Sequence, residues 1–257
     1  MKTITTNSSK TYVRYLMLMM IFIVTTVNYA DRATLSITGP QIRGEFGLSA
    51  VQMGFIFSAF SWTYMLAQIP GGWLLDRFGP RRVYGVSIFL WSLFTLLQAG
   101  VGLVGGIEFA VLSIFIMRLL VGLAEAPAFP ANAKIVSAWF PVQERGTASA
   151  IFNAGQYSAA VIFTPLMASI THLYGWRSVY AVMGFGGMLL AMFWLHWVRS
   201  PAKHKSVSTS ELRLIEQGGG LINMDENKVF SKNTSSPKSR AETFKQIRFL
   251  LTNRMLL

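Results

Sequence analysis

The most informative segment of this chain is Gly71-Gly72-Trp73-Leu74-Leu75-Asp76-Arg77-Phe78-Gly79-Pro80-Arg81-Arg82. It places one acid, three arginines and three glycines between two long apolar runs. Glycine and proline interrupt helices, and charged side chains are costly inside hydrocarbon. The stretch is therefore typical of a tight loop that joins two membrane-spanning helices.

The composition indicates a polytopic membrane protein. Of the 257 residues, 52% are hydrophobic and 13% are charged, whereas soluble domains carry about 25% charged residues. The absence of cysteine excludes disulfides and thiolate-bound metals, and His172, His196 and His204 lack ligand spacing, so we expect no metal and no cofactor. The net charge of +12 lies in particular loops, which favours membrane topology control over nucleic-acid binding.

Six apolar runs are long enough to cross a bilayer about 30 Å thick. The predicted spans are 15–38, 51–75, 83–104, 107–136, 148–172 and 178–198. A tail at 1–14 precedes this six-helix bundle of 15–198, a polar central loop follows at 199–245, and 246–257 reads as the start of a truncated seventh helix. Within the loop, Ser208 and Glu211 predict the beginning of a short surface helix.

Basic residues in short loops predict the orientation, because they favour the cytoplasmic side. An N-terminus inside the cell puts eight of them in the cytoplasm: Lys2, Lys10, Arg14, Arg77, Arg81, Arg82, Lys134 and Arg145. Three would lie outside: Arg32, Arg43 and Arg177. We therefore expect a multi-pass protein of the cell membrane whose N-terminus and central loop are cytoplasmic. Its seven tryptophans lie mostly toward span ends, which is typical of an interfacial belt.

The first and fourth spans carry ionisable residues, which in membrane helices are functional candidates. In the first span, Asn28, Asp31 and Arg32 have helical spacing and are predicted to share one face in the outer part of the bilayer. One interpretation is an ion pair that neutralises itself near the interface. The other is a proton-titrated acid beside a cation that faces an anionic substrate.

In the fourth span, Arg118, Gly122 and Glu125 also share a face, with the two charges about 10 Å apart along the helix. Each charge is therefore expected to meet water, substrate or another helix. Gly122 permits close approach of a partner between them. Pro127 and Pro130 follow, and they free backbone carbonyl groups of the kind that line cavities.

Together these residues favour a site for an anion carried with protons. Arginine donates two parallel hydrogen bonds to a carboxylate, and a buried acid beside arginine can be poised to take up and release a proton. Tyr64 of the second span, with Asn153, Gln156 and Tyr157 of the fifth, can add neutral hydrogen bonds to hydroxyl groups. Each of the four has the alternative of a simple polar contact between helices.

Several further stretches sharpen this picture, and with the loop at 71–82 the chain resembles the anion:cation symporter family of the major facilitator superfamily. Within that family it is similar to the glucarate/galactarate (hexarate) permeases, from about Arg14 onward. The stretches are Asn28 to Ser36, Gln68 to Trp73, Arg118 to Pro127, Ala138 to Pro141, Glu144 to Ala148, Ile151 to Asn153 and Gly219 to Asp225. Pro80 departs from the pattern, because the superfamily commonly has an arginine there.

The resemblance implies an all-α transmembrane fold made of two three-helix units of inverted topology, and proton-coupled uptake of a sugar acid by alternating access. It assigns proton coupling to Asp31 and Glu125, and substrate binding to Arg32, Arg118, Tyr29, Tyr64 and Gln156. It also makes the 71–82 loop a conformational latch that holds the two halves together, through Gly72, Asp76, Arg77, Gly79 and Arg81.

The family has twelve spans, and its site lies between two six-helix halves, so the sequence predicts the N-terminal half of such a protein. The expected partners are a sugar-acid anion, a proton, the lipid bilayer and a second six-helix half. Two alternatives stay open. The same fold could carry galactonate, a hexuronate or an aromatic acid. The chain could also be a six-helix membrane module that assembles with or regulates a partner without transporting. The residues show no nucleophile constellation, which argues against an enzyme.

Overall fold

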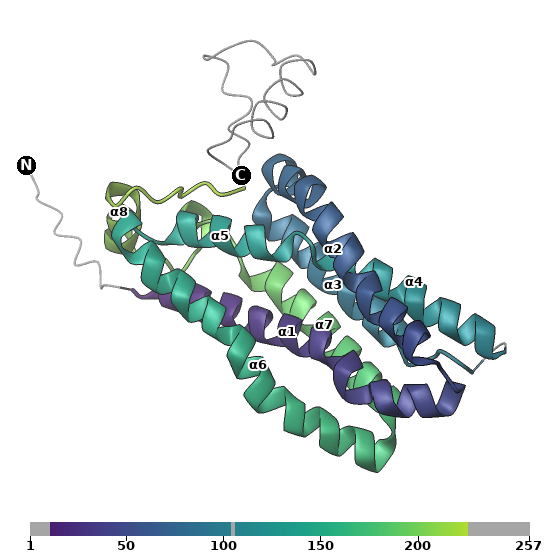
Figure 1. Cartoon of the computed structure of the whole chain (residues 1–257). Helices are drawn as coiled ribbons and strands as arrows, with labels where there is room; N and C mark the ends of the chain where they lie inside the picture. The colour runs from purple at the N-terminus through teal and green to yellow at the C-terminus, as the bar shows by residue number, and fades with distance from the viewer. Residues whose placement is uncertain (1–10, 104–105, 226–257) are drawn as a thin grey trace, which may run out of the picture. The chain divides into compact units, whose positions relative to one another are not determined.

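The computed structural model describes residues 11–103 and 106–225, and this part of the chain is helical with no β-strand (Figure 1). The long helices are α1 Val13–Phe46, α2 Ala50–Phe78, α3 Pro80–Gln98, α4 Ile107–Glu125, α5 Ala128–Trp139, α6 Arg145–Tyr174 and α7 Trp176–Trp197. Short elements are α8 Thr209–Gln217 and the 3-10 turns Val142–Glu144 and Pro201–Lys203. The predicted seventh helix at 246–257, the start of the tail and residues 226–245 of the central loop lie outside the described residues.

Five of the predicted spans correspond to one helix each, and the fourth is divided into α4 and α5. The division falls at Pro127, because proline lacks a backbone N–H and its ring clashes with the preceding turn. Four stretches are long and apolar enough to cross a membrane by length and composition: α1, α2, the run Ile107–Trp139 and α7. Helices α3 and α6 occupy the third and fifth predicted spans.

Helix α1 extends further than predicted. It continues through Pro40 to Phe46 and ends at Gly47, whose φ of 63° allows its N–H to donate to the Arg43 carbonyl. At 1.5 Å per residue, Asp31 lies about 27 Å from Val13 and about 22 Å from Phe46. Asp31 is thus near the middle of its helix.

The packing of the helices supports two related units. The most extensively packed pairs are α1 with α6, α2 with α4, and α3 with α7. Helices α1, α2 and α3 are the first three spans, and α4, α6 and α7 hold the corresponding places in the second three. Replacing each helix by its counterpart turns the α1–α6 pair into the α4–α2 pair and leaves the α3–α7 pair unchanged. An inverted repeat of two three-helix units has this property.

A glycine makes an equivalent close contact in the α4–α2 pair and in the α6–α1 pair. A Cβ atom at Gly122 of α4 would overlap the Phe60 carbonyl oxygen and Thr63 Oγ1 of α2. A Cβ atom at Gly155 of α6 would lie 3.0 Å from the Phe22 carbonyl oxygen and from Thr26 Oγ1 of α1. In each case a glycine lets two helix backbones approach, as in other membrane helix pairs. The approach predicted at Gly122 is made by a neighbouring helix.

Four tryptophans correct the prediction of an interfacial belt. Trp91, Trp139 and Trp194 are at most 1% exposed, and Trp176 is 3% exposed. Trp194 packs edge-on against Tyr84 at 4.8 Å between ring centroids, and its Nε1 donates to the Arg81 carbonyl. Trp139 is covered on one side by His204, in the polypeptide that follows α7.

That covering segment is residues 199–225, here called the docked linker, and it lies against the ends of α1, α3, α5 and α6 (Figure 1). The predicted cap of α8 is confirmed, because Ser208 Oγ accepts from the Glu211 N–H. The Glu211 carboxylate is buried and accepts from the Val13 and Arg14 N–H groups at 3.2 and 3.0 Å. It therefore caps the N-terminus of α1 from a distant part of the chain.

Arg145 fastens the other end of the docked linker. Its guanidinium donates to the Ser137 and Gly219 carbonyl oxygens at 3.0 and 2.7 Å. The backbone adds bonds from Val142 N–H to the Gly218 carbonyl and from Leu221 N–H to the Ser137 carbonyl. The described part of the predicted central loop is thus folded onto the helices rather than free.

Candidate functional site

An ion pair between α1 and α4 forms the centre of the candidate site. Arg32 Nε donates to Glu125 Oε2 at 2.7 Å. The Glu125 side chain is fully buried, whereas that of Arg32 is 21% exposed. The pair joins the two predicted charge sites, which lie 93 residues apart in sequence.

Aromatic rings surround the guanidinium of Arg32. Its central carbon lies 4.7 Å from the ring centroid of Tyr29, 4.5 Å from that of Tyr64 and 5.1 Å from that of Phe60. Phe60 and Tyr64 stack on each other one turn apart on α2. Cation–π attraction and these rings hold Arg32 in place while part of it stays accessible.

Asp31 does not pair with Arg32, so the interpretation of a self-neutralising pair on α1 is wrong. Asp31 is 3% exposed, and its Oδ2 accepts from Thr95 Oγ1 of α3 at 2.8 Å. Successive residues of a helix point about 100° apart, so Asp31 faces α3 while Arg32 faces α4. The prediction of one shared face holds for Asn28 and Arg32, since Asn28 also lies beside Glu125.

Arg118 is the fourth charge, and its position on α4 completes the cluster. It is 4% exposed, and its guanidinium carbon lies 5.3 Å from the Phe60 ring centroid. Arg118 is close enough to Asp31 and Glu125 to attract both carboxylates. With two acids and two arginines, the fully ionised cluster has no net charge.

The cluster keeps unused hydrogen-bonding capacity. Arg118 Nε is buried and has no hydrogen-bond partner among the described residues. Buried polar groups are normally paired, so such atoms mark a place where water or a ligand completes the bonding. The arrangement is suited to bind an anion.

The residues predicted on α6 are less closely tied to this cluster. Gln156 and Asn153 are half-buried, Tyr157 is 72% exposed, and none makes a hydrogen bond within residues 11–103 and 106–225. In the same part of the chain, no three His, Asp or Glu side chains gather as metal ligands.

The loop at 71–82 ends α2 and begins α3. Asp76 forms an ion pair with Lys134 of α5, within the same bundle. The Arg77 guanidinium carbon lies 5.2 Å from the Trp73 ring centroid and 5.5 Å from that of Phe78. Both Asp76 and Arg77 are exposed.

Gly79 lies at the turn itself, with φ of 81°, a region that favours glycine. A Cβ atom there would lie 2.8 Å from Oδ1 of Asp225 in the docked linker. That same oxygen accepts from the Arg81 N–H at 3.3 Å, so Asp225 caps α3. Gly72, by contrast, has open space around it in the described chain.

Comparison with known proteins places this geometry in a family. The sequence profile described as the Major Facilitator Superfamily matches residues 21–257. The chain belongs to the Major Facilitator Superfamily. It is therefore a multi-pass membrane protein, and its all-helical fold agrees with that family.

Two relatives within the superfamily are named for sugar acids. The chain is 52% identical over 254 residues to the probable galactarate/D-glucarate transporter GudP of Bacillus subtilis. The alignment covers 99% of this chain and 54% of that protein. It is 41% identical over 212 residues to a D-galactonate transporter of Escherichia coli O6:H1, covering 82% of the chain and 48% of that protein. The chain thus spans about half the length of these relatives, which are named as transporters rather than enzymes.

A solved transporter structure has the same fold. A bacterial homologue of the human lysosomal transporter Spinster, in an inward-facing and unoccupied conformation, aligns with a TM-score of 0.65 at 18% identity. The alignment covers 93% of this chain and 49% of the other.

Sequence reasoning missed four partners of the candidate residues. They are Thr95 for Asp31, Phe60 for the two arginines, Lys134 for Asp76 and Asp225 for the loop. Thr95 had a signal, because Ser92, Thr95 and Gln98 recur every third residue in an apolar span and all are buried. Phe60 and Asp225 had none, since an aromatic in a span and an acid in a linker are both commonplace.

Proposed function

We propose that this chain forms the first half of a proton-coupled symporter for a sugar-acid dianion such as galactarate or D-glucarate. The observation that carries the proposal is the buried pair of Arg32 and Glu125, in which the acid is enclosed and the arginine is partly open. The names of its sugar-acid relatives support the choice of substrate.

The coupling follows from competition for one arginine. A substrate carboxylate that binds Arg32 displaces Glu125, because both acids use the same guanidinium edge. A buried carboxylate left without its cation is costly, so Glu125 then takes up a proton and becomes neutral. Substrate and proton therefore enter the site together.

The charges of the cluster also match a dianion. Two buried acids, Asp31 and Glu125, can accept two protons, which balance the two carboxylates of a hexarate. Arg32 and Arg118 can each hold one carboxylate in a forked hydrogen bond. We assign Tyr29, Tyr64 and Gln156 to the hydroxyl groups of the sugar acid; Tyr29 and Tyr64 already flank Arg32.

Transport requires a second set of helices to close the other side of the site. The chain spans about half the length of its relatives, and alternating access takes place between two halves. We infer that the N-terminus and the docked linker face the cytoplasm, as the distribution of basic residues supports. In that frame, Gly72, Asp76, Arg77, Gly79 and Arg81 form the latch against the second half.

The test is uptake of labelled D-glucarate by cells that produce this chain fused to the second half of the Bacillus subtilis relative. We expect uptake that rises with an inward proton gradient and stops with an uncoupler. Arg118→Ala should abolish binding, and Glu125→Gln should flatten the pH dependence. Retained binding in Arg118→Ala, or unchanged pH dependence in Glu125→Gln, would refute the role assigned to that residue.

The second candidate function keeps the fold and changes the substrate to D-galactonate, which the 41% identical relative favours. Galactonate carries one carboxylate, so it needs one arginine and one proton. Competition of unlabelled galactonate and galactarate against labelled glucarate separates the two substrates.

A further inference from the structure

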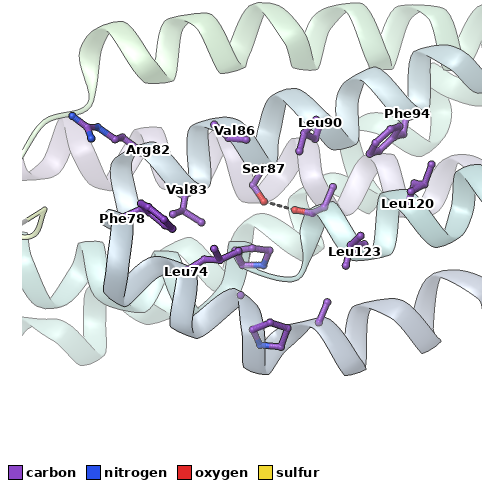
Figure 2. A pocket seen from close by; sticks show the side chains of 15 residues that line it. Leu74, Phe78, Arg82, Val83, Val86, Ser87, Leu90, Phe94, Leu120 and Leu123 are labelled. Atoms are coloured by element: carbon purple, nitrogen blue, oxygen red, sulfur yellow. Dashed lines mark hydrogen bonds between the residues drawn. The ribbon is translucent and has the colours of Figure 1, made fainter. Parts of the chain in front are cut away.

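A long groove opens between α2, α3 and α4 (Figure 2), and none of the four charged residues of the cluster is among those that line it. Its volume is about 570 Å³, and its walls are apolar. Leu74 and Phe78 of α2, Val86, Leu90 and Phe94 of α3, and Leu123 of α4 line it. The Ser87 hydroxyl in the wall donates to the Ala124 carbonyl, so it needs no partner from a ligand.

Arg82 is the one charged residue among those that line the groove, and it lies at the end next to Phe78 (Figure 2). Its side chain is exposed, and among residues 11–103 and 106–225 it meets no acceptor and no acid. Two carboxylates that border the turn between α2 and α3 have other partners, Asp76 with Lys134 and Asp225 with the start of α3. Arg82 therefore presents an uncompensated cation at one end of an apolar channel.

The length of the groove matches one leaflet of a membrane. Arg82 and Phe94 lie twelve residues apart on α3, which is about 18 Å along the helix. Half of a hydrocarbon core about 30 Å thick is about 15 Å. With the cation at the headgroup level, the far end at Phe94 reaches the middle of the bilayer.

We propose that this groove is a binding site for an anionic phospholipid, with one acyl chain along α3 and the phosphate on Arg82. A basic residue at the end of an apolar groove between helices provides both the charge and the shape that such a lipid needs. The lipid lies against the latch loop, because Leu74, Phe78 and Arg82 belong to both. This inference does not depend on which substrate, if any, the protein transports.

The experiment is native mass spectrometry of the 257-residue chain, released from detergent after titration with phosphatidylglycerol or with phosphatidylcholine of the same acyl chains. We expect phosphatidylglycerol binding to saturate at one lipid per chain, with at least tenfold preference over phosphatidylcholine. Arg82→Gln should remove that preference. Arg213→Gln, which removes an exposed arginine from α8, should preserve it.

The acyl chain is tested separately by filling the groove. Leu90→Trp, or the milder Leu90→Phe if the first variant fails to fold, should lower retention of both lipids at least fivefold. Val161→Trp is the matched control, because Val161 of α6 is 75% exposed. It should leave the retention of both lipids unchanged. Binding that does not saturate, and that depends neither on the headgroup nor on the Leu90 substitutions, would indicate annular lipid only. That result would overturn the proposal. Loss of the bound lipid in the fused two-half protein would also overturn it, because the second half would then fill the groove.

Discussion

Arg32 and Glu125 meet across 93 residues of sequence, and the acid in this pair is enclosed while the arginine keeps about a fifth of its side chain open. This asymmetry makes the arginine the member that a ligand can reach. The acid can change partners only by changing its protonation state.

Glu125→Gln in the fused two-half protein should separate exchange from uptake. A neutral glutamine leaves Arg32 free for the substrate but cannot release a proton. We expect exchange of labelled for unlabelled substrate to persist within about threefold, while proton-driven uptake falls at least tenfold, or about 1.4 kcal/mol in free energy. Vesicles loaded with substrate measure both, and equal loss of the two activities would contradict the prediction.

The ion pair should also be visible in the stability of the isolated chain. Arg32→Ala leaves a buried carboxylate unpaired and should lower the free energy of unfolding by about 3 kcal/mol. Glu125→Gln added to that variant removes the buried charge and should restore most of the loss. A double-mutant cycle from thermal unfolding in detergent measures the coupling, and additive effects would show that the pair contributes nothing.

Gly79→Ala should destabilise the chain, whereas Gly72→Ala should not. Alanine at Gly79 adopts a strained φ and its methyl group meets the Asp225 carboxylate, so we expect a loss of about 2 kcal/mol. Gly72 has open space, so its alanine variant is the matched control within the same loop. Comparison of their unfolding midpoints tests the difference. Any transport defect of Gly72→Ala would then report on the second half rather than on folding.

Docking of the linker should depend on pH through His204. Its ring lies between Trp139 and Trp197, at 5.7 and 5.5 Å between centroids. Burial, and then the nearby Arg199 cation, lower the pKa of His204, while Glu211 opposes the shift. The folded form thus favours neutral histidine, so stability is complete above the ordinary pKa of about 6.5 and is lost as the pH falls below it.

The measurement is the rate of proteolysis within residues 199–225 between pH 7.5 and pH 5. We expect cleavage to accelerate toward pH 5 in the native chain. His204→Phe keeps an aromatic ring between the two tryptophans and removes the titrating group, so its rate should change much less. An equal acceleration in both proteins would assign the pH dependence to another residue.

The sequence predicted the helices and the shared face of Asn28 and Arg32, because both follow from local periodicity. It did not predict the choice of partner. Nothing in the spacing of Asp31 and Arg32 says that one meets Thr95 and the other Glu125, since this depends on how α1 is rotated against α3 and α4. The burial of Trp139 and Trp194 was missed for a related reason, because their position near span ends is local and the packing that covers them is not.

The cap that Glu211 places on α1 has a consequence for the order in which the protein is made. Val13 and its acceptor are 198 residues apart, so the first membrane helix leaves the ribosome long before the residue that completes its N-terminus. Until then, the opening amides of α1 have only water or lipid headgroups to bond. The bundle therefore reaches its final hydrogen bonding only after α8 has been synthesised, and a chain cut at residue 198 would lack the carboxylate that caps its first helix.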